Sequence, residues 1–157
     1  MMIQTRQPIA LISAFVWVGF VCAISFLEAW LKFRAPGVTL PIGLGIGRLV
    51  FGALNKVEWI LAIVVLIDLA LQRPERRTAL WITLPVLALV AQTVWILPAL
   101  DSRAESIMHG GTPAPSDLHF VFVTFEVIKV AGLVLFGTLL FQPVQVPITN
   151  PHIPEFR

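Results

Sequence analysis

Four long apolar stretches, separated by short polar breaks, constrain the fold of this chain more than any other feature of its sequence. They lie at about residues 8–33, 43–71, 78–100 and 117–141. A helix needs about 20 predominantly apolar residues to cross the hydrocarbon core of a bilayer. Only helices and closed barrels satisfy all of their backbone hydrogen bonds there. We therefore predict an all-α, polytopic membrane protein that folds as a four-transmembrane-helix bundle.

The composition and the length agree with this prediction. Hydrophobic residues make up 57% of the 157 residues and charged residues only 13%, whereas soluble domains carry about 25% charged residues. Four spans with short connections nearly fill the chain, which indicates a single transmembrane domain over residues 1–157. Three prolines follow the fourth span and predict an extended tail over residues 143–157, because proline cannot continue a helix. They are Pro147, Pro151 and Pro154.

Proline, glycine and charged residues mark the ends of the spans. Pro36 and Gly37 interrupt the chain after the first span, and the charged segment 73–77 separates the second span from the third. Residues 104–108 are able to extend the third helix before the glycines at 110 and 111 end it. We expect kinks in that helix at Pro85 and Pro98, which membrane helices tolerate better than soluble ones.

Four spans place both termini on the same side of the membrane. Five arginines lie on that side: Arg6, Arg73, Arg76, Arg77 and Arg157. Four basic residues lie on the other side: Lys32, Arg34, Arg48 and Arg103. Because cytoplasmic loops carry the excess of lysine and arginine, this bias predicts that both termini are cytoplasmic.

The sequence also argues against several classes of function. The net charge of +2 is small and scattered, without the basic patches that nucleic-acid binding requires, so we expect no nucleic-acid partner. The single cysteine, Cys22, excludes a disulfide within the chain. No nucleophile elbow or Ser-x-x-Lys motif surrounds any serine, so the sequence does not favour an enzyme.

Ionisable side chains within the apolar stretches are the best indicators of function. Such charges are costly inside a bilayer, so each needs a partner or a purpose. The conspicuous ones are Glu28, Lys56, Glu58, Glu126 and Lys129. At about 1.5 Å per residue from the span ends, Glu28, Asn55, Gln92 and Glu126 lie roughly 9–14 Å below one membrane face. With neighbours at helical spacing, we predict a polar layer of Glu28, Lys32, Arg48, Asn55, Glu58, His119, Glu126 and Lys129.

Two interpretations of this layer remain open from the sequence. The first is a set of ion pairs that join Glu28 to Lys32 or Arg48, Glu126 to Lys129, and Glu58 to a cation of a neighbouring helix. The second is a metal or proton site that uses His119 and Glu126 with Glu58 or Glu28, since imidazole and carboxylate suit zinc, iron or copper. The sequence requires no cofactor, and the second interpretation would add a metal ion.

Three short segments carry a resemblance to known membrane proteins. They are residues 25–33 (Ser-Phe-Leu-Glu-Ala-Trp-Leu-Lys-Phe), 47–51 (Gly-Arg-Leu-Val-Phe) and 117–119 (Asp-Leu-His). The chain resembles a broad family of uncharacterised bacterial four-helix membrane proteins, which is similar to transmembrane protein 205-like and copper-resistance-protein-D-like domains. The resemblance covers most of residues 8–141 and implies a four-helix bundle, which we expect in a bacterial inner membrane.

From these observations we expect a structural or accessory role in the membrane. The chain would contact the lipid bilayer and would pack as a subunit of a larger membrane complex, or associate with copies of itself. The alternative is a small transporter, or a protein that handles metal ions or protons, that uses the buried Glu/His layer with Glu28, Glu58, His119 and Glu126.

Overall fold

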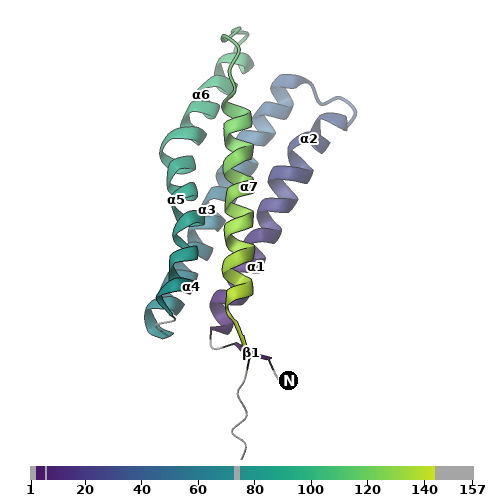
Figure 1. Cartoon of the computed structure of the whole chain (residues 1–157). Helices are drawn as coiled ribbons and strands as arrows, with labels where there is room; N and C mark the ends of the chain where they lie inside the picture. The colour runs from purple at the N-terminus through teal and green to yellow at the C-terminus, as the bar shows by residue number, and fades with distance from the viewer. Residues whose placement is uncertain (1–2, 6, 73–74, 144–157) are drawn as a thin grey trace, which may run out of the picture.

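The computed structural model describes residues 3–5, 7–72 and 75–143, and these form a bundle of four long helical spans (Figure 1). The spans are Pro8–Arg34, Leu40–Gln72, Thr78–Met108 and Leu118–Leu139. Each is long and apolar enough to cross a membrane. The predicted all-α bundle of four membrane helices is therefore confirmed.

The first span is not a uniform α-helix. It begins as α1 (Pro8–Val21), continues through a π-helical segment, η1 (Cys22–Glu28), and ends as α2 (Ala29–Leu31) and a 3₁₀ turn, η2 (Lys32–Arg34). The second span is the single helix α3 (Leu40–Gln72). It begins three residues before the predicted start, because Pro41 lies in its first turn, where a missing backbone N–H breaks no hydrogen bond.

The third span shows the irregularity that its two prolines predict. Its elements are α4 (Arg76–Trp81), which begins two residues before the span, α5 (Thr83–Ala91), a π-helical segment η3 (Gln92–Ile96) and α6 (Leu97–Met108). Pro85 has no N–H for the carbonyl of Trp81, and the helix breaks between α4 and α5 at Ile82. Pro98 likewise lacks an N–H for the carbonyl of Val94, inside η3. The span also runs past residue 100 to Met108, before Gly110 takes a positive φ of 83°.

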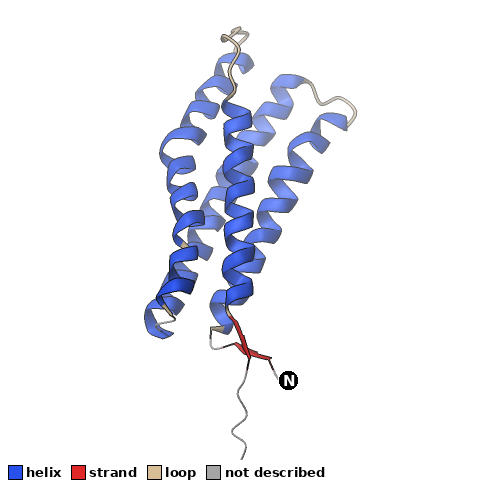
Figure 2. Ribbon diagram, viewed as in Figure 1, coloured by secondary structure: helices blue, strands red, loops and turns tan. Residues whose placement is uncertain are grey.

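The fourth span is α7 (Leu118–Leu139), which ends two residues before the predicted limit. The chain leaves the helix there to form a short strand, β2 (Phe141–Pro143), which pairs antiparallel with β1 (Ile3–Thr5). Figure 2 shows this two-stranded ribbon below the bundle. Pro143 is therefore extended, as predicted, while residues 144–157 of the predicted tail lie outside the described part of the chain.

Small residues and the buried Asp68 mediate several of the contacts between the spans. A Cβ atom on Gly132 of α7 would lie 3.0 Å from Pro85 Cδ, so the glycine lets α7 approach α5 closely. The ring of Phe33 lies directly against Gly43 at the start of α3. At the opposite end of the bundle, the buried Asp68 of α3 accepts a hydrogen bond of 2.9 Å from the backbone N–H of Ala10. Asp68 thus satisfies a free donor in the first turn of α1 from another helix.

Candidate functional site

A cluster of polar side chains lies deep inside the bundle, and all four spans contribute to it. We call it the buried polar cluster: Trp17, Glu58, Gln92, Glu126 and Lys129, none more than 2% exposed. The Lys129 ammonium pairs with Glu58 Oε1 and lies 3.1 Å from Glu126 Oε1. It also donates to Gln92 Oε1 at 2.6 Å. Lysine carries three donors, so these three acceptors satisfy the ammonium completely.

Neutral donors complete the cluster. Gln92 Nε2 donates to Glu126 Oε1 at 2.8 Å, and the indole Nε1 of Trp17 donates to Glu58 Oε1 at 2.8 Å. The other oxygen of Glu126, Oε2, is buried without a hydrogen-bond partner among the described residues. Such networks fix which helix faces meet more than they raise stability, because desolvation offsets most of the Coulomb attraction.

The structure contains ion pairs that the ion-pair interpretation predicts, two within the buried polar cluster and one outside it. Lys129 is the cation for both Glu126 and Glu58, and Lys32 pairs with Glu28 at 3.1 Å. Sequence reasoning placed Gln92 at the depth of Glu126 but did not include it in the predicted layer. It did not place Trp17 in the layer, because no local pattern shows that an indole N–H on the first span faces an acid on the second.

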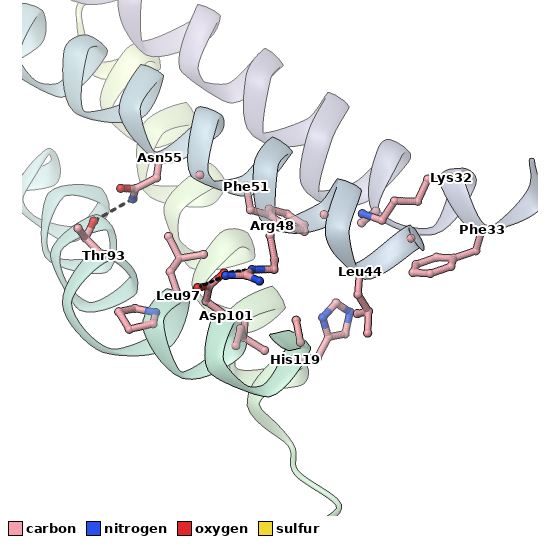
Figure 3. Close-up of a pocket in the computed structure, with 17 residues that line it drawn as sticks. Lys32, Phe33, Leu44, Arg48, Phe51, Asn55, Thr93, Leu97, Asp101 and His119 are labelled. Carbon is pink, nitrogen blue, oxygen red and sulfur yellow. Dashed lines mark hydrogen bonds and ion pairs between the residues drawn. The ribbon is translucent and has the colours of Figure 1, made fainter. Parts of the chain in front are cut away.

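A pocket of about 470 Å³ lies between the second and third spans and the ends of the first and fourth (Figure 3). Residues of α2, η2, α3, η3, α6 and α7 line it. Phe33, Leu44, Phe51 and Leu97 supply much of its apolar wall. Figure 3 shows Lys32 and His119 toward one end of the pocket and the pair of Asn55 and Thr93 at the other end.

Polar contacts connect the helices around this pocket. Arg48 of α3 makes a two-pronged ion pair with Asp101 of α6, in which Nε faces Oδ1 and NH2 donates to Oδ2 at 2.8 Å. Asn55 Nδ2 donates to the hydroxyl of Thr93 at 2.8 Å, and Trp59 Nε1 donates to the same oxygen at 3.0 Å. These contacts hold α3 against the third span along the length of the pocket.

The predicted single layer is thus divided between two places. Glu58, Glu126 and Lys129 belong to the buried polar cluster. Lys32, Arg48, Asn55 and His119 line the pocket, and Glu28 pairs with Lys32 at its edge. Asp101 and Thr93, which bind Arg48 and Asn55, were missed because neither is tied to its partner by spacing along one helix.

The residues predicted as metal ligands are not grouped in the structure. His119 lines the pocket, whose wall includes neither Glu58 nor Glu126. Those two carboxylates face each other across the Lys129 ammonium, which occupies the position that a cation would need. In residues 3–5, 7–72 and 75–143 no group of three or more His, Cys, Asp or Glu side chains is placed to hold a metal ion.

The fold and its apolar exterior define the class of this protein as an integral membrane four-helix bundle. Comparison with family models, curated proteins and solved structures finds no match. The resemblance to bacterial four-helix membrane proteins therefore stays a prediction.

Proposed function

We propose that this chain is an accessory subunit of a larger membrane complex and that the outer side of α3 packs against another membrane protein. The proposal is based on the environment of Lys56. Its side chain is exposed and has no partner among the described residues. The neighbouring charges Glu58, Glu126 and Lys129 are all buried and paired.

Lys56 lies close to the middle of the membrane. The 22 residues of α7 are about 33 Å long at 1.5 Å per residue, which matches a hydrocarbon core of about 30 Å. Lys129 lies near the centre of α7, 11 residues after Leu118 and 10 before Leu139, and it pairs with Glu58. Lys56 precedes Glu58 by two residues, which is about 3 Å along the helix.

An uncompensated lysine at this depth is unfavourable in lipid. A lysine at the centre of a membrane helix costs about 2.5–3.5 kcal/mol on insertion scales. The interface lies about 15 Å from the midplane. The four-carbon stem of lysine is too short for its ammonium to reach that far. A carboxylate on a neighbouring membrane helix would remove this cost, because the two charges would then neutralise each other.

The surroundings of Lys56 indicate a different protein rather than a second copy as the partner. Lys56 lies among exposed apolar residues at helical spacing, which we call the outer face of α3: Leu49, Lys56, Ile60, Ile63 and Ile67. Two copies that met through this face would bring two lysines together. They would offer no carboxylate in return, because Glu58 and Glu126 are buried around Lys129. We therefore infer a partner with an Asp or Glu within a membrane span.

Photo-crosslinking in native membranes tests this function. A photoreactive residue at Ile60 should give one adduct of discrete mass, which differs from twice the 17.3 kDa of this chain. Lys56→Glu should abolish the adduct through charge repulsion, and Lys56→Arg should keep it. A photoreactive residue at Ile12, which is also exposed but lies on α1, is the matched control. A chain that gives no adduct at Ile60, or an adduct of twice its own mass, would contradict the proposal.

Proton handling is the second candidate function, and one observation favours it. Two carboxylates face a single ammonium in the buried polar cluster, and Glu126 Oε2 is free to accept a proton there. If the chain carries protons, liposomes that contain it and a trapped pH-sensitive dye should change internal pH when a potential is imposed. Glu126→Gln should then abolish the change, whereas Glu28→Gln should preserve it. Wild-type liposomes that match empty ones would exclude this candidate.

A further inference from the structure

The pocket between the second and third spans is separate from the outer face of α3. Its size and its lining are those of a ligand site. Its volume of about 470 Å³ falls within the range of about 300–1,000 Å³ that small-molecule sites occupy. Such sites combine a mainly apolar wall with a few polar groups that fix the orientation of the ligand. Here the apolar wall and the polar groups have a definite order along the pocket (Figure 3).

Lys32 is the polar group best placed to receive a ligand. Its side chain is only 8% exposed, and Glu28 is its one hydrogen-bond acceptor within the described residues. Two of its three donors are therefore free. The ammonium lies 5.6 Å from the ring centre of Phe33 and 5.2 Å from that of Phe51. Gly47 leaves room for it, since a Cβ atom there would lie 3.1 Å from Lys32 Nζ.

Two further groups make this end of the pocket suitable for an anion. His119 lines the pocket and has no partner among the described residues. It lies in the first turn of α7, where the free backbone N–H groups of a helix favour negative charge. Arg48 also lines this region, although Asp101 holds its guanidinium. Asp101 accepts from two of the five N–H groups of Arg48, so this end offers donors from Lys32, His119 and Arg48.

The rest of the pocket suits a hydrocarbon chain. From Arg48 to Asn55 the wall follows seven residues of α3, which is about 10 Å. Along this distance Phe51 and Leu97 face the cavity (Figure 3). At the far end, one amide N–H of Asn55 and the indole N–H of Trp59 are bonded to the hydroxyl of Thr93. A ligand with charge at one end and hydrocarbon behind it matches this order.

We propose that the pocket binds an anionic amphiphile, with a phosphate or carboxylate head beside Lys32 and His119 and an acyl chain along Phe51 and Leu97. A membrane phospholipid and a free fatty acid both present this chemistry to these residues, and the experiment below distinguishes them. This inference does not depend on the proposed docking of α3, and it concerns the purified chain by itself.

Binding of a dansyl-labelled undecanoic acid to the purified protein in neutral detergent tests the proposal. We expect saturable binding, seen as energy transfer from tryptophan, and no comparable binding of the methyl ester of the probe. Lys32→Met should weaken binding by about tenfold or more, equivalent to about 1.4 kcal/mol. Phosphatidylglycerol should displace the probe if phospholipids are ligands, and displacement by oleate alone would assign the site to fatty acids. Phosphatidylcholine and inorganic phosphate should displace it poorly.

A second variant keeps the test decisive if Lys32→Met fails to fold. Gly52 lines the pocket, and a Cβ atom there would meet nothing within 4 Å, so we expect α3 to accept Gly52→Leu and the added side chain to narrow the cavity. It should abolish binding. The control is Ala53→Leu, at the next residue of α3, which is exposed and does not line the pocket. Equal binding by wild type and Gly52→Leu, or equal binding of the acid and its ester, would overturn the proposal.

Discussion

Replacement of Lys129 by methionine is expected to lower the free energy of unfolding by about 3–5 kcal/mol, the usual cost of removing one partner from a buried ion pair. The substitution nearly preserves the volume of the side chain but removes the ammonium that Glu58, Gln92 and Glu126 share. Two carboxylates would then face each other in the interior without a cation. Titration with SDS in mixed micelles, followed by tryptophan fluorescence, measures the change.

The same substitution at Lys56 provides the matched control. Lys56 lies on the same level of the bundle but is exposed and has no partner among the described residues. Lys56→Met should therefore leave the stability of the isolated chain unchanged or raise it. Addition of Glu58→Gln and Glu126→Gln to Lys129→Met should recover much of the loss, because the buried charges are then gone. A Lys129→Met protein as stable as the wild type would show that the cluster does not hold the spans together.

Gly132→Leu is expected to destabilise the bundle by about 1–3 kcal/mol, as overpacking of a filled interior does. A Cβ atom at this position would lie 3.0 Å from Pro85 Cδ and 3.4 Å from Leu84 Cδ2. The proline ring is fixed to the backbone of α5, so it has no rotamer by which to move aside. The two helices would have to separate close to the buried polar cluster. The same SDS titration measures this loss.

Ala131→Leu is the control for this prediction, since Ala131 adjoins Gly132 on α7 but is exposed. It should have little effect on stability. Pro85→Ala should restore part of the stability of the Gly132→Leu protein, because it removes the ring atoms that the leucine meets. If Gly132→Leu and Ala131→Leu unfold at the same SDS concentration, the close approach of α5 and α7 does not contribute to stability.

Most of the fold was predictable because each span is determined by its own composition. Long apolar runs must be helical in a bilayer, wherever the other spans lie. The boundaries were less predictable at residues 40 and 139, where Pro41 occupies the first turn of α3 and strand pairing begins just after α7. Pairing of Phe141–Pro143 with Ile3–Thr5 joins the two ends of the described chain, and no local pattern in either segment indicates it.

The contacts in the candidate sites were predictable only in part. Contacts between residues of one helix were predictable, whereas contacts between different spans were not. The pairs Glu28 with Lys32 and Glu126 with Lys129 are four and three residues apart, so helix geometry alone brings them together. The pairs of Arg48 with Asp101 and Asn55 with Thr93 join different spans. Each depends on the rotation of one helix against another, which the sequence of a single helix does not specify.

The sequence by itself determined that this protein is a membrane bundle and that several of its charges lie within the spans. Only the tertiary structure decided which of those charges are satisfied. Lys129 and Lys56 are equally conspicuous in the sequence, yet the packing buries the first between Glu58 and Glu126 and leaves the second exposed without a partner among the described residues. The reason is physical. The depth of a side chain follows from its position along its helix, whereas the packing of the neighbouring helices determines whether that side chain is buried and which partners it meets.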